Sequence, residues 1–290
     1  MIKAKPFVVA ASTLVVVFAV GFFGVRGMQT PPETRDPPST AAAPAEPLPS
    51  VPAAPAAAPF PAVPPNADPG AERQALVAEM REGYARAAPD APNLLDLLSA
   101  RFPADLDGII EAVTTSPLPS SASTQRALAE TFVAIQARDG SKLGRAPGMA
   151  LRQFMAAQRD LLVAAAADGT VSCTTPARAP TPAIARLSIL RLYGLLAAIA
   201  DGRDHPVERP AASKDDYVAF AQATMDKGVD VSRWKGVSDP ATEPARVCQG
   251  LISMYDAAVK TEGPLGDRIL AAFAQDQLTT SMAVYQPVLK

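Results

Sequence analysis

The longest apolar run in the chain covers residues 7–25, which carry no charge and are rich in valine, phenylalanine and alanine. A helix of this length is roughly 28 Å long, about the thickness of the hydrocarbon core of a bilayer. Lys3 and Lys5 precede the run and Arg26 follows it, so the positive-inside rule places the first residues in the cytoplasm. We therefore predict a membrane anchor in residues 1–28, with one transmembrane helix at residues 7–25.

A cleaved signal peptide is the alternative interpretation of this apolar run. Small residues flank possible cleavage sites at residues 19–21 and 25–27. The first site is followed at once by Phe22 and Phe23, so the apolar run continues through it, and the second would place Arg26 beside the cut. An uncleaved anchor is therefore favoured. Under either interpretation the rest of the chain is exported, and cleavage would make it a secreted protein.

Proline dominates the next segment, since fourteen of the chain's 30 prolines lie between Pro31 and Pro69. Proline lacks the backbone donor, fixes φ and restricts the residue before it, so a helical turn cannot nucleate here. We predict that residues 29–69 are a disordered Pro/Ala-rich linker, an extended spacer on the order of 100 Å long. Recognition by a proline-reading module is the alternative role of this segment.

From residue 70 onward the pattern of apolar positions is that of α-helices. Asp68 and Pro69 form a helix start, after which Leu76, Met80 and Tyr84 recur at four-residue spacing. Alternating runs of valine, isoleucine and threonine are nearly absent, so no sheet is expected. We predict that residues 70–290 form an all-α, compact multi-helix extracytoplasmic domain. Further helices are expected at residues 94–100, 104–113, 214–227, 244–260 and 265–278.

Three helical patterns end at the same Asp-Gly dipeptide, at residues 139–140, 168–169 and 201–202. Glycine directly after a helix often adopts the left-handed cap conformation that other residues resist, so we predict a helix end at each site. The spacings of 29 and 33 residues between these sites leave a helical-repeat architecture as the alternative.

The pattern before Gly202 is apolar on nearly all faces apart from Arg186 and Arg191. Its apolar centre is too short and too charged to span a bilayer. We therefore predict that this segment is the central buried helix of the domain.

Residues 70–290 hold 23 lysines and arginines against 25 aspartates and glutamates. Nucleic-acid binding depends on clustered cations that neutralise several phosphates, so this balance argues against a nucleic-acid partner. The length of this part is sufficient to bury a full hydrophobic core without a metal or several disulfides.

Cys173 and Cys248 are the two cysteines of the chain, and both lie in the part expected to be exported. Disulfides persist in oxidising compartments, so we predict that these residues form one disulfide bond. Two buried thiols are the alternative. A redox role would require a C-x-x-C pair, which the sequence does not contain.

His205, the single histidine, lies among Asp201, Asp204 and Glu208. A histidine with neighbouring carboxylates can ligate a divalent metal or act as a base. Because His205 follows a helix end and shares its segment with two arginines, a solvated charged loop is the better interpretation.

Ser232 and Lys235 match the S-x-x-K nucleophile pattern of penicillin-recognising enzymes. The S-x-N and K-T-G motifs that accompany it are missing, so we expect Trp234 to pack while its neighbours lie on the surface. No nucleotide-binding loop, nucleophile elbow or zinc-spaced cysteine set is present.

Carboxylates on predicted helices leave a distant glycosidase pair open, because its two members need not be close in sequence. Each one also has an exposed-face explanation, so we assign no catalytic, cofactor-binding or metal-binding residue. The carboxylates concerned are Glu111, Glu130 and Asp160.

The layout favours a non-enzymatic binding or scaffold protein of the cell envelope. An anchor in the inner membrane and a long spacer would let the helical domain reach an envelope protein or cell-wall component. The Ala- and Pro-rich composition favours a bacterial periplasm as the compartment. The alternatives are an exported helical hydrolase acting on cell-wall glycan and a helical domain that binds apolar ligands.

Overall fold

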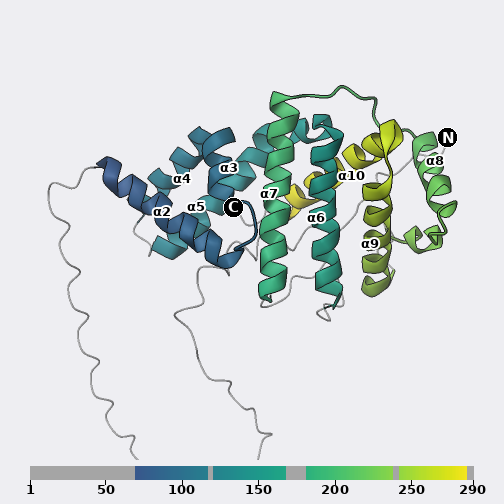
Figure 1. The fold of residues 1–290 in the computed structure, drawn as a ribbon, viewed down its shortest axis with the longest axis horizontal. Helices are drawn as coiled ribbons and strands as arrows, with labels where there is room; N and C mark the ends of the chain where they lie inside the picture. Colours follow the sequence, from purple (N-terminus) through teal and green to yellow (C-terminus); the bar gives the residue numbers. More distant parts are fainter. Residues whose placement is uncertain (1–68, 117–119, 168–180, 238–241, 286–290) are drawn as a thin grey trace, which may run out of the picture.

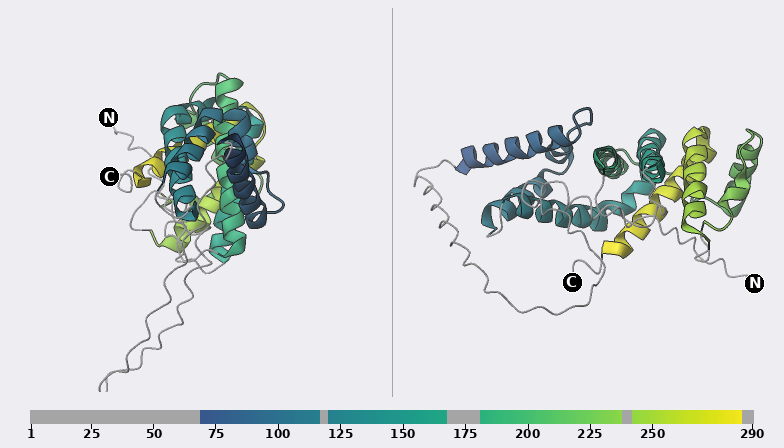
Figure 2. Two further views of the ribbon diagram at one scale, coloured as in Figure 1. Left: turned by 90° about the vertical axis from the view of Figure 1, so that its left-hand side faces the viewer. Right: turned by 90° about the horizontal axis from the view of Figure 1, so that it is seen from below.

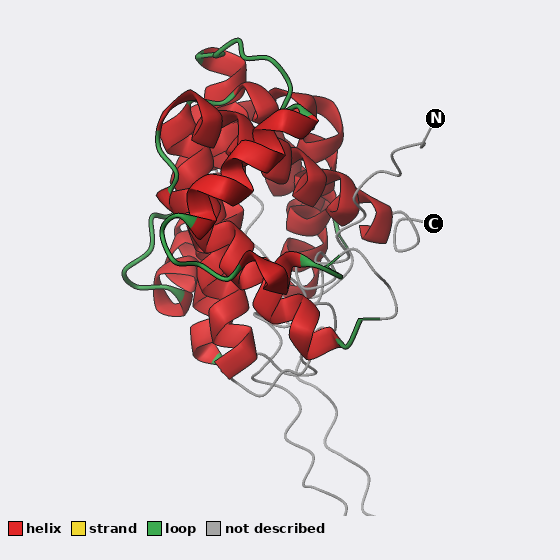
Figure 3. Ribbon diagram, turned by 90° about the vertical axis from the view of Figure 1, so that its right-hand side faces the viewer, coloured by secondary structure: helices red, strands yellow, loops and turns green. Residues whose placement is uncertain are grey.

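The computed structural model describes residues 69–116, 120–167, 181–237 and 242–285 (Figure 1). The predicted membrane helix at residues 7–25 and the predicted linker, apart from Pro69, lie outside these residues. The described part contains nine α-helices, two short 3-10 helices and no strand (Figure 3). The all-α prediction is therefore confirmed for this part of the chain.

The helices form an N-terminal group followed by a larger C-terminal group (Figures 1 and 2). The first group is α2 (Pro69–Ala87), α3 (Leu94–Arg101), α4 (Pro103–Thr115) and α5 (Ser120–Asp139). The second group is η1 (Gly140–Arg145), α6 (Gly148–Ala167), α7 (Pro182–Asp204), α8 (Lys214–Met225), η2 (Val231–Trp234), α9 (Pro244–Lys260) and α10 (Gly263–Tyr285).

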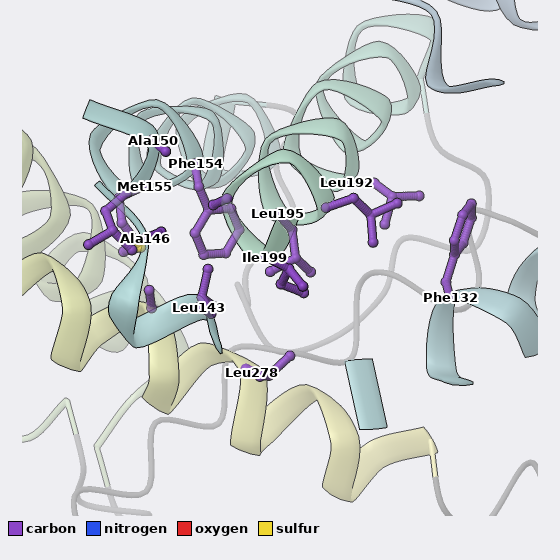
Figure 4. Packing of buried hydrophobic residues seen from close by; sticks show 14 of the residues in the cluster. Phe132, Leu143, Ala146, Ala150, Phe154, Met155, Leu192, Leu195, Ile199 and Leu278 are labelled. Carbon is purple, nitrogen blue, oxygen red and sulfur yellow. The ribbon is translucent and has the colours of Figure 1, made fainter. Parts of the chain in front are cut away.

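Within the second group α6 lies between α7 and α9, while α8 is at the far edge (Figure 1). The segment around η1 packs between α7 and α10. Figure 4 shows Leu143 of η1 between Phe154 of α6 and Leu278 of α10, with Ile199 of α7 beside it. All four side chains belong to one hydrophobic core cluster that extends through both groups of helices.

Several helices begin and end where local sequence chemistry predicts. Helices α2 and α9 begin at Pro69 and Pro244, and α9 ends at Lys260 as expected. The first turn of α8 is closed by a capping box: the Ser213 Oγ accepts from the Asp216 backbone at 3.1 Å, and Asp216 Oδ2 accepts from the Ser213 backbone at 2.8 Å. This reciprocal pair satisfies two donors that a helix start otherwise leaves unpaired.

The helix end predicted at residues 139–140 is confirmed and the one predicted at residues 201–202 is wrong, and neither glycine adopts the left-handed cap. Gly140 follows α5 but begins η1, and Gly202 lies inside α7, which continues to Asp204. Neither glycine has a positive φ. The third site, residues 168–169, lies outside the described residues. The described glycines that do adopt positive φ are Gly228, Gly236 and Gly263.

Gly202 is required for close packing instead of helix capping. A Cβ atom at this position would lie 2.0 Å from the carbonyl oxygen of Lys142. Only the absence of a side chain lets α7 approach the backbone of η1 this closely.

Helix α7 is packed into the core, as its apolar pattern predicts. Among the described residues it is the one helix long and apolar enough to cross a membrane, but half of its most apolar window is buried inside the protein. Ile184, Leu195 and Ile199 on its inner face are almost completely buried. The prediction of a buried core helix is therefore confirmed.

Candidate functional site

A group of seven charged side chains lies where the N-terminal helices meet the end of α7. We call this group the junction network. Its side chains come from α3, α4, α5 and α7, which are far apart in sequence. Its members are Arg101, Asp105, Arg138, Asp139, Asp201, Arg203 and Asp204.

Arg101, in the last turn of α3, joins α3 to the end of α7. Its Nη2 donates to Asp201 Oδ1 at 2.8 Å, and its Nε donates to Asp204 Oδ2 at 3.1 Å. Carboxylates near the C-terminus of a helix are disfavoured by the helix dipole. Because Arg101 lies against both aspartates, it offsets this unfavourable placement on α7.

Arg203 completes the contact between α7 and α3. Its guanidinium donates to Asp204 Oδ1 at 2.7 Å and to the Arg101 carbonyl at 2.8 Å, and it lies 5.0 Å from the centre of the buried Phe102 ring. The hydrogen bond from Arg203, together with the charges of Arg203 and Arg101, lowers the pKa of Asp204 to about 2.

Arg138 extends the junction network to α4 and α5. It forms a bidentate pair with Asp105, with both nitrogen–oxygen distances at 2.9 Å, and also donates to Asp139 at 2.8 Å. The hydrogen bonds to Asp105 and Asp139 raise the pKa of Arg138 above its usual value. Such fork-to-carboxylate pairs are among the stronger and more directional hydrogen bonds in proteins.

The arrangement suits attachment better than catalysis. An aspartate whose pKa is about 2 stays ionised at neutral pH and cannot act as a general acid there. The guanidinium groups in turn are already directed at aspartates of the same protein. The junction network therefore holds the N-terminal helices to α7.

A second polar group is buried in the middle of the C-terminal helices. Arg191 of α7 is 2% exposed, its Nε donates to Gln158 of α6, and its guanidinium lies 5.8 Å from the centre of the Phe154 ring. Gln277 of α10 donates to the Tyr255 hydroxyl of α9, and both residues are buried. Four helices thus contribute polar atoms to one region of the core.

Burial shifts the pKa values of two side chains in this region, Tyr255 and Asp276. Desolvation raises the pKa of Tyr255 well above its usual value, although the positive charge of Arg191 opposes the shift. Asp276, next to Gln277, is partly buried, and desolvation raises the pKa of its carboxyl group. A neutral phenol and a charged guanidinium in a close-packed interior provide hydrogen bonds and packing specificity.

His205 lies at the end of α7, where its backbone nitrogen donates to the Asp201 carbonyl at 2.7 Å. The residue is exposed, which agrees with the prediction of a solvated position. Across the described residues, no group of three or more histidine, cysteine, aspartate and glutamate side chains is placed to hold a metal ion.

Ser232 lies in η2 and Lys235 directly after it, and both are exposed. The backbone nitrogen of Ser232 donates to Asp230 Oδ1 at 3.0 Å, so Asp230 caps the short helix. Trp234 packs as predicted: its ring stacks on Phe220 at 5.2 Å, and its Nε1 donates to a serine of α9 at 3.2 Å.

The three carboxylates considered for hydrolysis lie on three different helices. Glu130 pairs with Arg126 at 2.8 Å, Asp160 pairs with Arg159 at 2.7 Å, and Glu111 is exposed on α4. Their surroundings are those of helix surfaces, as the sequence pattern predicts.

Cys248 is 3% exposed on the inner face of α9, and no described cysteine is a free thiol. Its predicted partner, Cys173, lies outside the described residues. The bond between the two cysteines therefore stays a prediction.

No protein-family model, curated protein or solved structure matches this chain.

Proposed function

We propose that this protein is a membrane-anchored scaffold or binding protein of the bacterial cell envelope. In this proposal residues 7–25 cross the inner membrane, residues 29–69 form the spacer, and the helical domain works in the periplasm. The observation that carries the proposal is the order of these segments: an uncharged apolar run, then fourteen prolines between Pro31 and Pro69, then a helical body. A spacer of this kind is useful when a domain must reach a partner away from the bilayer.

The pairing of aspartates with arginines in the junction network supports a binding role over a catalytic one. The junction network holds its aspartates against arginines, and the lowered pKa of Asp204 keeps that carboxyl group from donating a proton at neutral pH. Glycan hydrolysis would require two carboxyl groups on either side of a bond, one of them with a raised pKa. Desolvation raises the pKa of Asp276, which is partly buried on α10, and no second carboxylate is placed opposite it by the ion pairs and hydrogen bonds of the described residues.

Membrane attachment is tested by fractionating cells that express the full chain. We expect the protein in the inner-membrane fraction after a carbonate wash, with residues 69–285 digested by protease only when the periplasm is opened. A matched variant with Val15→Lys and Val16→Lys should lose membrane retention, because charges at the centre of the bilayer are strongly disfavoured. Recovery of a shortened, soluble wild-type chain would instead establish the secreted alternative.

Partner binding is tested by placing a photo-crosslinking residue at exposed apolar positions of the anchored protein. Met149 at the start of α6 and Val218 on α8 are 67% and 60% exposed and lie on separate helices. We expect one of the two positions to yield a defined crosslinked envelope component in intact cells. Glu82 on the exposed side of α2 serves as a control position. Crosslinks to no other molecule at Met149 and at Val218 would contradict the scaffold proposal.

A further inference from the structure

Helix α2 runs along the outside of the N-terminal group of helices (Figures 1 and 2). Its main contacts are with α3, α4 and α7, and we call the part of these helices under α2 the α2-binding surface. Unlike α10, which contacts η1 and four other helices, α2 has no main contact with α6 or α9.

The apolar attachment of α2 is limited to one stripe of side chains. Met80, Tyr84 and Ala88 are buried, and Leu76 is half-buried one turn earlier. Most of the first half of the helix is exposed. A single stripe with four-residue spacing is the arrangement by which a helix binds a groove on another protein.

Two exposed ion pairs fix the position of α2 on its surface. Arg73 pairs with Asp107 of α4, and Arg81 pairs with Asp96 of α3 at 2.7 Å. Each of these four side chains is roughly half exposed, so the pairs contribute little stability. They do determine which charges on α2 oppose which charges on the α2-binding surface.

The connection from α2 to α3 is short and contains Pro89 and Pro92. Proline cannot continue the helix, so the backbone changes direction here, between Ala88 and the start of α3 at Leu94. If α2 moved to another molecule, the dihedral angles of this connection would change, whereas each contact of the helix could be formed again.

We infer that α2 is an exchangeable helix, and that its binding surface accepts the α2 of a second copy of this chain. The second copy is the partner that fits because its helix presents the same apolar stripe and the same arginines. Exchange of an identical element is a low-cost route to a dimer, since the interactions broken within each molecule form again between the two molecules. The exchange involves described residues alone and does not depend on the proposed function.

Charge reversal provides a direct test with the purified full chain. One variant carries Arg73→Asp and Arg81→Asp, which makes α2 acidic. The other carries Asp96→Arg and Asp107→Arg, which makes the α2-binding surface basic. Within each variant the helix and its own surface have like charges, whereas a reciprocal exchange between the two variants places opposite charges at all four positions.

We expect the mixture to form a heterodimer that exceeds either homodimer by about tenfold in native mass spectrometry, since each exposed pair contributes modestly but four change together. The matched control is a chain with all four substitutions, which restores opposite charges within one molecule and should remain mainly monomeric. A mixture that stays monomeric while both variants keep their helical circular dichroism would overturn the inference.

Hydrogen exchange of the wild-type chain gives a second measurement that does not depend on the variants. Because α2 can detach by itself, its backbone amides should exchange at least about tenfold faster than those of α6 and α7. Equal protection of α2 and the central helices would mean that α2 leaves only on global unfolding, which would also overturn the inference.

Discussion

Gly202 of α7 lies so close to Lys142 of η1 that a Cβ atom on Gly202 would be 2.0 Å from the Lys142 carbonyl oxygen. The same Cβ would lie 3.0 Å from the backbone nitrogen of Ala146. Both neighbours are backbone atoms, which cannot move aside in the way a flexible side chain can. The glycine thus sets the distance between the last turns of α7 and η1.

Gly202→Ala should destabilise the protein by about 1–3 kcal/mol, the usual cost of forcing an extra methyl group into a packed interior. The higher helix propensity of alanine opposes this effect by up to about 1 kcal/mol. The steric effect should dominate because it displaces the backbone of η1. Chemical denaturation of both proteins measures the difference in unfolding free energy.

Gly108→Ala is the matched control for this substitution. Gly108 is also inside an α-helix, α4, but it is exposed and a Cβ there would meet nothing within 4 Å. Its replacement should stabilise the protein by about 0.5–1 kcal/mol through helix propensity alone. Equal effects at the two glycines would show that the contact with Lys142 is not important.

Several helix starts could be predicted from the sequence, whereas the role of Gly202 could not. Helix starts at Pro69 and Pro244 depend on nearby residues, so the sequence indicates them directly. An apolar stretch followed by glycine has the same sequence pattern in two cases: the glycine ends the helix, or it lets the helix backbone approach another backbone closely. At Gly202 the distinction depends on Lys142, sixty residues earlier, which no local pattern reveals.

The junction network could not be predicted for a similar reason. Arg101 and Asp204 are 103 positions apart in sequence, and no spacing rule connects them. Arg191 is a different case, because it occurs at helical spacing from the apolar residues Ile184 and Leu195. A charged residue on the buried face of an apolar helix is a signal that the sequence did contain.

Arg191→Ala should destabilise the protein by about 2–4 kcal/mol. The substitution removes the donor to the buried Gln158 and the contact with the Phe154 ring, and an interior hydrogen-bonding group without its partner is costly. Arg186→Ala on the same helix is the control. Arg186 is exposed and its distance to Asp90 is 3.4 Å, so its loss should change stability by less than about 0.5 kcal/mol.

The lowered pKa of Asp204 predicts that the protein loses stability in acid. Its pKa in the folded protein is about 2, below the usual value of about 3.9 in an unfolded chain. The stabilisation by its charge is therefore present above about pH 4 and is lost as the pH falls toward 2. The unfolding free energy of wild type minus that of Asp204→Asn should decrease as the pH falls from about 4 to about 2.

The pKa of Asp276 is shifted in the opposite direction to that of Asp204, so its pH dependence has the opposite sign. Burial raises the pKa of its carboxyl group, so its contribution is present at low pH and is lost as the pH rises through the raised pKa. Asp276→Asn should therefore gain stability relative to wild type as the pH rises above about 4. If both difference curves had the same slope, the assigned surroundings of these aspartates would be wrong.

The predicted bond between Cys173 and Cys248 has a test that distinguishes it from two buried thiols. If the bond exists, Cys173→Ala, Cys248→Ala and the double variant should all lose similar stability, because each removes the same cross-link, about 4 kcal/mol in the chain-entropy model. Two separate thiols would instead give effects that add in the double variant. Denaturation of the four exported proteins measures these values, and mass spectrometry without reduction should identify the linked peptides in the wild type alone. Additive losses together with alkylation of both cysteines in the folded protein would contradict the bond.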